Sequence, residues 1–378
     1  MQQGTPTRKD PGAAAKAKFK GTPLHPYYYA GPAWLSSHNM MSEDGSVAAA
    51  SSPSIELDDD NFAASSLLAL DARKEDERSG NPYQIVARAT VALTVLWNLV
   101  NPESLDGATA AAWSAIYHWE AASAPLFEAE VASFGFFTWI IMFSGLHLFL
   151  GRERTMEARL DGCMPTRPFE WAEPKNFHLW FYPLGSYLGS IWFYHQFLHE
   201  KPPLPAEAPT FGVFAVELIF GVFLYDLCFA PIHILMHKSS FGQLRKIHGY
   251  HHRVSTHALN SLETVQHSYL DGFFQVMVNI IVQQVTPFGA FGHKHVMSRL
   301  AHNLLVTYLL SEAHSGYDLP WMSHRLFPEL LGGAPRHEKH HHDGRLYYQQ
   351  FFKYLDDFFG FSEEALGLGS SAPSRTTS

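Results

Sequence analysis

The sequence predicts an all-α integral membrane protein with about four transmembrane helices, a helical hairpin that is re-entrant or spanning, and a cytosolic cap rich in histidine. Three observations favour this fold class. Of the 378 residues, 46% are hydrophobic and 14% aromatic. The apolar residues gather into blocks of about 20, the length that an α-helix needs to cross a bilayer. Most polar residues lie instead in the first 80 positions and in the last third, where histidines cluster.

Composition divides the chain into four parts. Residues 1–80 are rich in alanine, serine, glycine, proline and charge. Such a segment cannot bury enough apolar surface to fold alone, so we expect it to be disordered or loosely attached. Residues 81–210 contain the first membrane helices, and residues 211–362 form a histidine-rich domain. Residues 363–378 are expected to be a disordered tail.

The predicted transmembrane helices correspond to four hydrophobic blocks, at about residues 84–101, 132–150, 178–198 and 211–236. The loop between the first two blocks, from 101 to 131, has no lysine or arginine, whereas the loop after the second block has five basic residues. Because positively charged loops stay in the cytosol, the second loop is predicted to be cytosolic. Following the chain onward, the end of the fourth block is cytosolic as well.

Two further apolar stretches, near residues 272–291 and 296–313, are interrupted by polar residues such as Asn279, Arg299 and His302. Together they have the length of a hairpin that dips into or crosses the membrane and returns to the same side. Polar side chains at such depth usually face a protein interior or a cavity. We therefore expect the hairpin to line a lipid pocket and to bring His314 back to the cytosolic side.

Three histidine clusters, HILMH, HGYHH and HEKHH, are the most informative pattern. Spacings of three or four residues place side chains on one face of a helix, so each cluster can aim its imidazoles at a common point. The clusters contain His233, His237, His248, His251, His252, His337, His340 and His341. Neutral imidazole binds iron, zinc, copper and nickel, and eight ligands are more than one ion needs. The clusters therefore predict a dinuclear metal site.

In their order and spacing the clusters resemble the histidine boxes of the fatty acid hydroxylase and sterol desaturase superfamily of membrane diiron enzymes. The run from His314 to His341, HSGYDLPWMSHRLFPELLGGAPRHEKHH, is similar to the corresponding stretch of cholesterol 25-hydroxylases. Through HSGYD and PW it is also similar to sterol C4-methyl oxidases. The resemblance covers the chain from about residue 215 to about residue 360.

The resemblance implies that residues 211–362 are a diiron domain, in which His314 and the eight box histidines bind two iron ions. Zinc can replace iron in a structure. The implied reaction uses O2 to oxidise a C–H bond of a sterol or other lipid, by hydroxylation or else by C4-methyl oxidation or desaturation. Electrons would come from NAD(P)H through cytochrome b5 or a reductase. The implied location is the endoplasmic reticulum membrane, with the metal site facing the cytosol.

Three details of the site stay open in the sequence. His267, in TVQHSYLD, matches a histidine of the methyl oxidases and is either a ligand or a hydrogen-bond partner of one. After the third box the family's Trp-Asp pair reads Leu355-Asp356, which leaves the lipid undetermined. A ligating imidazole commonly donates its other N–H to a carboxylate. The carboxylates considered for this role are Asp226, Glu263, Glu312, Glu338 and Asp343.

The alternative function is a non-redox membrane protein that binds zinc at the same histidines for structure, storage or transport. Against it, a structural zinc site is usually closed and four-coordinate, so one such ion would leave half of these ligands unused. The two cysteines, Cys163 and Cys228, form no CxxC pair and predict no thiolate site. A formal net charge of −9, without a basic groove, argues against nucleic-acid binding.

Overall fold

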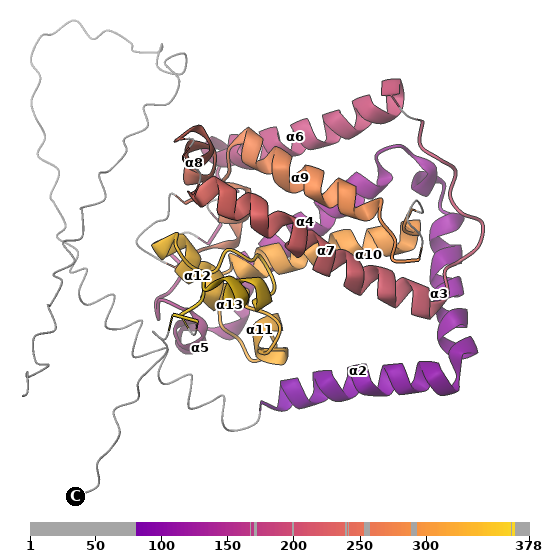
Figure 1. The fold of residues 1–378 in the computed structure, drawn as a ribbon, viewed down its shortest axis with the longest axis horizontal. Helices are drawn as coiled ribbons and strands as arrows, with labels where there is room; N and C mark the ends of the chain where they lie inside the picture. The colour runs from indigo at the N-terminus through magenta and orange to yellow at the C-terminus, as the bar shows by residue number, and fades with distance from the viewer. Residues whose placement is uncertain are drawn as a thin grey trace, which may run out of the picture. The chain divides into compact units, whose positions relative to one another are not determined.

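In a computed structural model of the chain, the described residues run from 81 to 366, with short gaps at 167, 170–171, 199, 239, 241, 253–257, 289–292 and 364. The predicted disordered segment 1–80 and most of the predicted tail 363–378 lie outside them. The described part is helical (Figure 1), which confirms the predicted all-α class. Within it, the only β-structure is two isolated bridges.

The helical elements are α2 (Pro82–Val100), α3 (Pro102–Tyr117), η3 (Glu120–Ser123), α4 (Phe127–Leu150), α5 (Arg152–Ala158), η5 (Pro174–Asn176), α6 (Phe177–Phe193), η6 (Tyr194–Leu198), α7 (Phe211–Lys238), α8 (Gly242–Gly249), η7 (Ser261–Val265), α9 (Tyr269–Gln283), α10 (Val296–Ala313), α11 (Ser323–Leu326), α12 (Gly333–Asp343) and α13 (Tyr354–Phe359).

Three of the described helices, α2, α4 and α7, are long and apolar enough to cross a membrane. They coincide with the first, second and fourth predicted blocks. The third block is helical too, as the 17-residue α6 followed by the π-helix η6, with Pro183 inside α6. The three candidate spans differ in burial: α2 buries none of its residues, whereas α7 buries nine. Helix α7 is therefore the central helix of the part that holds the histidines.

The segment 101–131, which the sequence analysis treats as a loop, is largely helical and contains α3. Pro102 occupies the first turn of α3, where its missing N–H removes no helical hydrogen bond. The alanine-rich sequence that follows has high helix propensity. Trp113 is buried and donates its indole N–H to the carbonyl of Pro205 at 3.0 Å. The segment was treated as a loop because it lies between two hydrophobic blocks, and hydrophobicity alone does not show whether a connection is helical.

Helices α9 and α10 form the predicted hairpin and lie against α7 (Figure 1). Helix α10 has the predicted bounds, whereas α9 ends at Gln283, earlier than the predicted 291. At the hairpin's turn, Thr286 donates to Glu217 near the start of α7 at 2.9 Å. Glu217 and His233 are 16 residues apart, which is about 24 Å of helix. The hairpin thus follows α7 over a length close to the roughly 30 Å hydrocarbon thickness of a bilayer.

The loop between α5 and α6, predicted to be cytosolic, contacts the backbone around His314. Arg159 and Tyr317 form an antiparallel bridge. The Arg159 guanidinium donates to the carbonyls of Ala258 and Ser315, at 3.1 and 3.4 Å, and pairs with Asp161. The basic loop and the end of α10 that bears His314 therefore lie on the same side of the helical bundle.

Candidate metal centre

Short helical segments bring the predicted histidines together. His233 and His237 lie in the last two turns of α7, one helical turn apart. His248 ends α8, and His251 and His252 follow in a turn whose N–H groups bond to the His248 carbonyl at 2.9 and 3.4 Å. Helix α12 carries the third cluster, and His314 directly follows α10.

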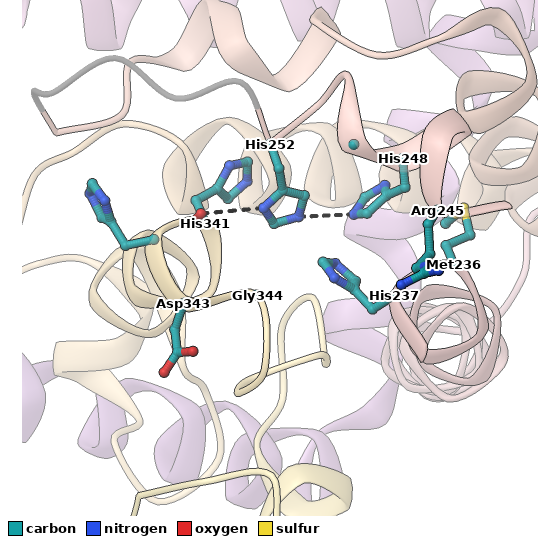
Figure 2. Close-up of a pocket in the computed structure, with 10 residues that line it drawn as sticks. Met236, His237, Arg245, His248, His252, His341, Asp343 and Gly344 are labelled. Atoms are coloured by element: carbon teal, nitrogen blue, oxygen red, sulfur yellow. Dashed lines mark hydrogen bonds between the residues drawn. The ribbon is translucent and has the colours of Figure 1, made fainter. Parts of the chain in front are cut away.

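The nine predicted ligands form two groups of converging imidazoles, and in each group the candidate ligand atoms lie within 4.8 Å of one another. Group one consists of His233, His237, His248, His252 and His340. Group two consists of His251, His314, His337 and His341. Figure 2 shows His252 of group one between His248 and His341, the latter from group two. The two groups are therefore adjacent, as a dinuclear site requires.

The facing nitrogens are close enough to share an ion. In group one the Nε2 atom of His233 lies 2.9 Å from that of His248 and 3.1 Å from that of His340. In group two the Nε2 atom of His337 lies 2.9 Å from that of His314 and 3.1 Å from that of His341. Transition metals hold imidazole nitrogen at about 2.0–2.1 Å, so two ligands at right angles would be about 3.0 Å apart.

Hydrogen bonds at the outer nitrogens show that these facing nitrogens carry lone pairs. The Nδ1 atoms of six imidazoles lie at 2.7–3.4 Å from a carbonyl or carboxylate oxygen, which can only accept. The six are His233, His248, His251, His252, His314 and His340. A neutral imidazole has one N–H, so their Nε2 atoms are unprotonated. Lone pairs facing one another at about 3 Å repel unless a cation lies between them, so the donor set fits metal ions.

Burial keeps the imidazoles neutral. It lowers the pKa of His252 to about 3 and that of His314 to about 4. For His248, His251 and His337 burial, assisted by neighbouring imidazoles, holds the pKa well below 6.5. The same holds for His340 and His341. Neutral imidazole is the form that binds a metal.

Asp271, which the sequence analysis does not name, is the carboxylate that contacts a candidate ligand. It is fully buried at the start of α9 and accepts the Nδ1–H of His248 at 2.8 Å. This is the carboxylate–histidine arrangement that orients metal-bound imidazoles. Its sequence context is Ser-x-x-Asp, and Ser268 does cap α9. That pattern predicts the start of a helix and gives no indication of the contact with His248.

The five carboxylates named from the sequence have other partners. Glu263 completes a capping box, Glu312 bonds to Ser323, Glu338 bonds to Leu259 N and His342, and Asp343 bonds to Arg345. Asp226 accepts hydrogen bonds from the C-terminal segment that is described below. His267 lies in neither group, and its ring packs against Gly272. Among the described contacts, the carboxylate that bonds to a candidate ligand is thus Asp271 and none of these five candidates, for which a capping or surface role was the default interpretation.

The segment 346–352 presents backbone, as well as aromatic side chains, to the histidines. The carbonyls of Leu346 and Tyr348 each accept from a group-one imidazole, His340 and His233 respectively, at 2.7 Å. Between them Tyr347 has a φ of 57°, in the left-handed region that non-glycine residues seldom adopt. Such outliers persist only where the surroundings hold them.

Two buried carboxylates hold this segment in place. Asp356 accepts the N–H groups of Tyr348 and Gln349 at 2.8 and 3.0 Å. Asp226, on α7, accepts those of Gln350 and Phe351, both at 2.8 Å. The acid that follows Leu355 thus fixes backbone next to the histidines, while the change from tryptophan to leucine leaves this contact intact.

A cavity of about 240 Å³ borders group one (Figure 2). Its lining includes His237, His248 and His252 together with Arg245 and Asp343. Pockets for drug-sized ligands measure roughly 300–1,000 Å³. This cavity therefore has the size for small molecules beside the imidazoles, and it is too small for a lipid.

The geometry defines a class of protein: a helical, membrane-type chain with two adjacent groups of histidines that could hold metal ions. A family model described as fatty acid hydroxylase matches residues 218–361, the part that contains all nine of these histidines. Over these residues the chain is similar to the fatty acid hydroxylase family, the resemblance on which the histidine-box prediction was based.

Several relatives are similar to this chain. A cholesterol 25-hydroxylase-like protein of Danio rerio is 35% identical over 159 residues, which are 41% of this chain and 59% of that protein. The cholesterol 25-hydroxylase of Homo sapiens is 30% identical over 160 residues, 42% of this chain and 55% of the human protein. A cholesterol 25-hydroxylase-like protein of Caenorhabditis briggsae is 26% identical over 63% of this chain and 76% of its own length. The chain thus spans little more than half of the two vertebrate relatives. No solved structure matches it.

Proposed function

We propose that the chain is a membrane-bound diiron oxygenase that uses O2 and reducing equivalents to hydroxylate a C–H bond of a sterol or related lipid. The observation that carries this proposal is the convergence of nine neutral imidazoles into two adjacent groups whose lone pairs face inward. The hydroxylase domain and the named cholesterol 25-hydroxylase relatives support the lipid substrate. Desaturation and C4-methyl oxidation are alternative outcomes at the same site.

Iron would be held by His233, His237, His248, His252 and His340 in group one and by His251, His314, His337 and His341 in group two. What iron supplies when bound is the reductive activation of O2, which no side chain performs alone. In hydroxylation one oxygen atom enters the C–H bond and the other leaves as water, with two electrons and two protons consumed. The electrons would come from NAD(P)H through cytochrome b5 or a reductase.

The chain's own residues orient the ligands and limit water. Asp271 and the carbonyls of Leu346 and Tyr348 fix the rings of three group-one imidazoles through their Nδ1–H groups. Phe229 stacks beside His233 and is 1% exposed, so the α7 side of group one is apolar. The small cavity on the other side gives O2 and protons a route to the imidazoles.

Membrane position is part of the proposal. Three apolar helices suit a multi-pass protein, and the basic loop after α5 contacts the backbone beside His314. By the positive-inside rule this side would be cytosolic, and the endoplasmic reticulum is the proposed membrane. A cytosolic metal site would be accessible to a soluble or membrane-anchored electron donor.

The zinc-binding alternative makes a different geometric demand. Tetrahedral zinc, at about 2.0–2.1 Å from each nitrogen, separates its ligands by about 3.4 Å, whereas right angles give about 3.0 Å. Six described Nε2 separations lie at 2.9–3.2 Å, near the right-angle value. The five histidines of group one exceed the four of a closed zinc site, which supports iron there.

The test combines metal analysis with lipid mass spectrometry under ¹⁸O2. The wild-type chain, reconstituted anaerobically with iron in a sterol-containing membrane and then supplied with NAD(P)H, a reductase and ¹⁸O2, should bind two irons and add one ¹⁸O atom to a lipid. His251→Ala should abolish the labelled product, whereas replacement of the exposed His118 by alanine should not. A chain that binds only zinc and yields no labelled lipid would support the alternative.

A further inference from the structure

A second polar cluster lies inside the helical bundle, far from the histidine groups. It consists of Lys294, just before α10, with Ser298 and His302 on α10, and it faces Gly221 on α7. Lys294 is 1% exposed, and Ser298 and His302 are fully buried. Lysine is almost never fully buried unless it is paired. Yet Lys294 Nζ, Ser298 Oγ and His302 Nδ1 have no hydrogen-bond partner within the described part of the chain.

Two of these atoms point into the space that Gly221 leaves. A Cβ atom at Gly221 would lie 2.5 Å from Lys294 Nζ and 2.7 Å from His302 Nδ1. A methyl group could not fit there unless one of them moved. The ammonium and the imidazole therefore fill a notch that exists because α7 has no side chain at this position, and a ligand atom enters between them when the flexible lysine side chain moves.

The polarity of the notch can be assigned from its surroundings. His302 Nε2 bonds to the amide oxygen of Asn279 at 2.9 Å, and Asn279 in turn donates to Asn303 at 3.0 Å. Because an amide oxygen only accepts, His302 Nε2 carries the proton and Nδ1 carries a lone pair. Lys294 Nζ can only donate. A donor and an acceptor side by side match a hydroxyl group, which accepts from one and donates to the other; a carboxylate or phosphate cannot donate.

The notch lies at a distance from the histidines that suits a lipid. Gly221 and His233 are 12 residues apart on α7, which is about 18 Å. The hydrocarbon core of about 30 Å holds two leaflets, so a lipid that fills one leaflet is about 15 Å long. A lipid with its polar end in the notch would therefore present its far end to the histidine groups.

The surface between the notch and the histidines is apolar. It is formed by side chains of α7, α9 and α10 that belong to one buried cluster: Val222, Tyr225, Phe229, Val278, Val282, Val306 and Leu309. These side chains pack against one another in the structure. A bound hydrocarbon would therefore lie between α7 and the α9–α10 hairpin, with the helices moved apart to admit it. Apolar contact is what a lipid chain requires over this length.

We propose that Lys294 and His302 bind a free hydroxyl at the polar end of the lipid substrate, and that their distance from the histidine groups selects a carbon near the opposite end. The inference rests on the proposed oxygenase function and narrows its substrate class to an elongated lipid alcohol. Lys294 and His302 position the substrate, and the oxidised carbon is far from both.

The test compares a lipid alcohol with its ether. Binding of cholesterol and of its methyl ether is measured with the metal-free full-length protein in lipid nanodiscs, and turnover of both with the iron-loaded protein. Wild type should bind the alcohol roughly tenfold to hundredfold more tightly, because the ether leaves buried polar atoms unpaired. Lys294→Met, which keeps the side chain's length, should remove most of this preference while the affinity for the ether and the iron content stay unchanged.

Glycine substitutions on α7 supply a matched pair. Gly221→Ala places a methyl group against Lys294 and His302 and should reduce the preference for the alcohol in the same way. Gly212→Ala, on the same helix, meets no atom within 4 Å and should behave as wild type. Both changes add one methyl group to α7, so their difference reports the notch and not helix propensity.

The outcomes separate this inference from the proposed function. Equal wild-type binding of alcohol and ether, as expected if the notch holds only water, would overturn the inference even if lipid is oxidised. The inference would also be overturned if the affinity of Lys294→Met fell by the same factor for the alcohol and for the ether, because the lysine would then be purely structural. Preferential binding of the alcohol without oxidation of any lipid would sustain the hydroxyl site and reject the oxygenase.

Discussion

The two histidine groups are built from the same residue type but are supported differently. In group one, His248 donates its Nδ1–H to the buried carboxylate of Asp271 at 2.8 Å. His233 and His340 donate theirs to backbone carbonyls at 2.7 Å. Such outer bonds fix the ring and make the imidazole a more basic ligand. Among the described contacts of this group, His237 alone has an unpartnered ring nitrogen.

Group two has weaker outer support and no carboxylate among its described hydrogen-bond partners. His314 and His251 bond to backbone carbonyls at 2.9 and 3.2 Å. The Nδ1 atoms of His337 and His341, both on α12, have no partner among the described residues. The contrast teaches that the two sites are unequal. We expect group one to hold its ion more tightly and group two to be the site that loses or exchanges metal first.

The largest expected effect comes from removing one ligand of each group. His248→Ala and His341→Ala should each lower lipid oxidation by more than about a hundredfold, since even a partner of a metal ligand is commonly worth tenfold to a hundredfold. Iron content should fall from two ions to one in each variant, because each keeps the ion of the intact group. Iron per chain and oxidised lipid are measured together, with His118→Ala as the exposed control. Normal turnover in either variant would contradict a two-ion site.

The second effect concerns the carboxylate that only group one has. Asp271→Asn keeps an oxygen for His248 but removes the charge, so the affinity of group one for metal should fall tenfold to a hundredfold while group two is unaffected. Competition with a chelator, followed by metal analysis, measures both sites. Asp357→Asn is the control, because Asp357 is partly exposed and pairs with Arg336. Asp271 would not be the source of the difference between the two groups if group one of Asp271→Asn lost its ion at the same chelator concentration as group one of the wild type.

A third, smaller effect tests the carbonyls that support group one. Asp226 accepts the backbone N–H groups of residues 350–352, and the preceding chain includes the Tyr348 carbonyl that accepts from His233. Asp226→Asn should lower the free energy of unfolding by about 1–3 kcal/mol, because an amide cannot accept from every N–H that the carboxylate serves. Unfolding of the metal-free protein in mixed micelles gives this value.

The matching control for Asp226 is an exposed carboxylate. Glu329 pairs with Arg88, and its side chain is 66% exposed. Exposed ion pairs contribute little to stability, so Glu329→Gln should change it less than Asp226→Asn does. Equal changes in the two variants would indicate that Asp226 has no special role in holding the C-terminal segment.

The site could be predicted from the sequence wherever its geometry is local. The spacing of three and four residues fixes which histidines share a face, and the apolar stretch 296–313 fixes α10, so the placement of His314 follows from the length of the hairpin. The helix α3 was missed because the prediction searched for long hydrophobic blocks and did not consider helix propensity in the connections between them.

Long-range partners were beyond the sequence. Backbone carbonyls such as those of Leu346 and Tyr348 exist at every residue and have no sequence signature. Asp271 lies 23 positions after His248 in the sequence. The capping pattern Ser-x-x-Asp already accounts for an acidic residue at this position, so nothing in the sequence indicates the contact with His248. The notch at Gly221 likewise forms only when distant parts of the chain pack together. A glycine, a lysine and a histidine at these positions form no recognisable sequence motif.

The smallest effect concerns a buried histidine that supports group two. The loop after His314 is held by buried His324, whose Nε2 bonds to Asp318 at 2.9 Å. Burial by itself lowers the pKa of His324, but the hydrogen bond to Asp318 and the Glu312 carboxylate, 3.9 Å from Nδ1, outweigh it and raise the pKa above 6.5. Asp318 also bonds to Arg325, so its carboxylate stays charged beside the imidazole, and its own pKa lies below the usual range.

The sign of the resulting pH dependence follows from the raised pKa. The folded chain keeps a proton on His324 at pH values where the unfolded chain has lost it, so this stabilisation is fully present below pH 6.5 and disappears as pH rises through the raised value. The unfolding midpoint of the metal-free protein should therefore fall above pH 6.5 in wild type. In His324→Gln this part of the slope should vanish, because glutamine does not titrate. An identical slope in both proteins would mean that the loop beside His314 is not held by a charged histidine. The support of group two would then be as independent of pH as the bond between Asp271 and the neutral His248.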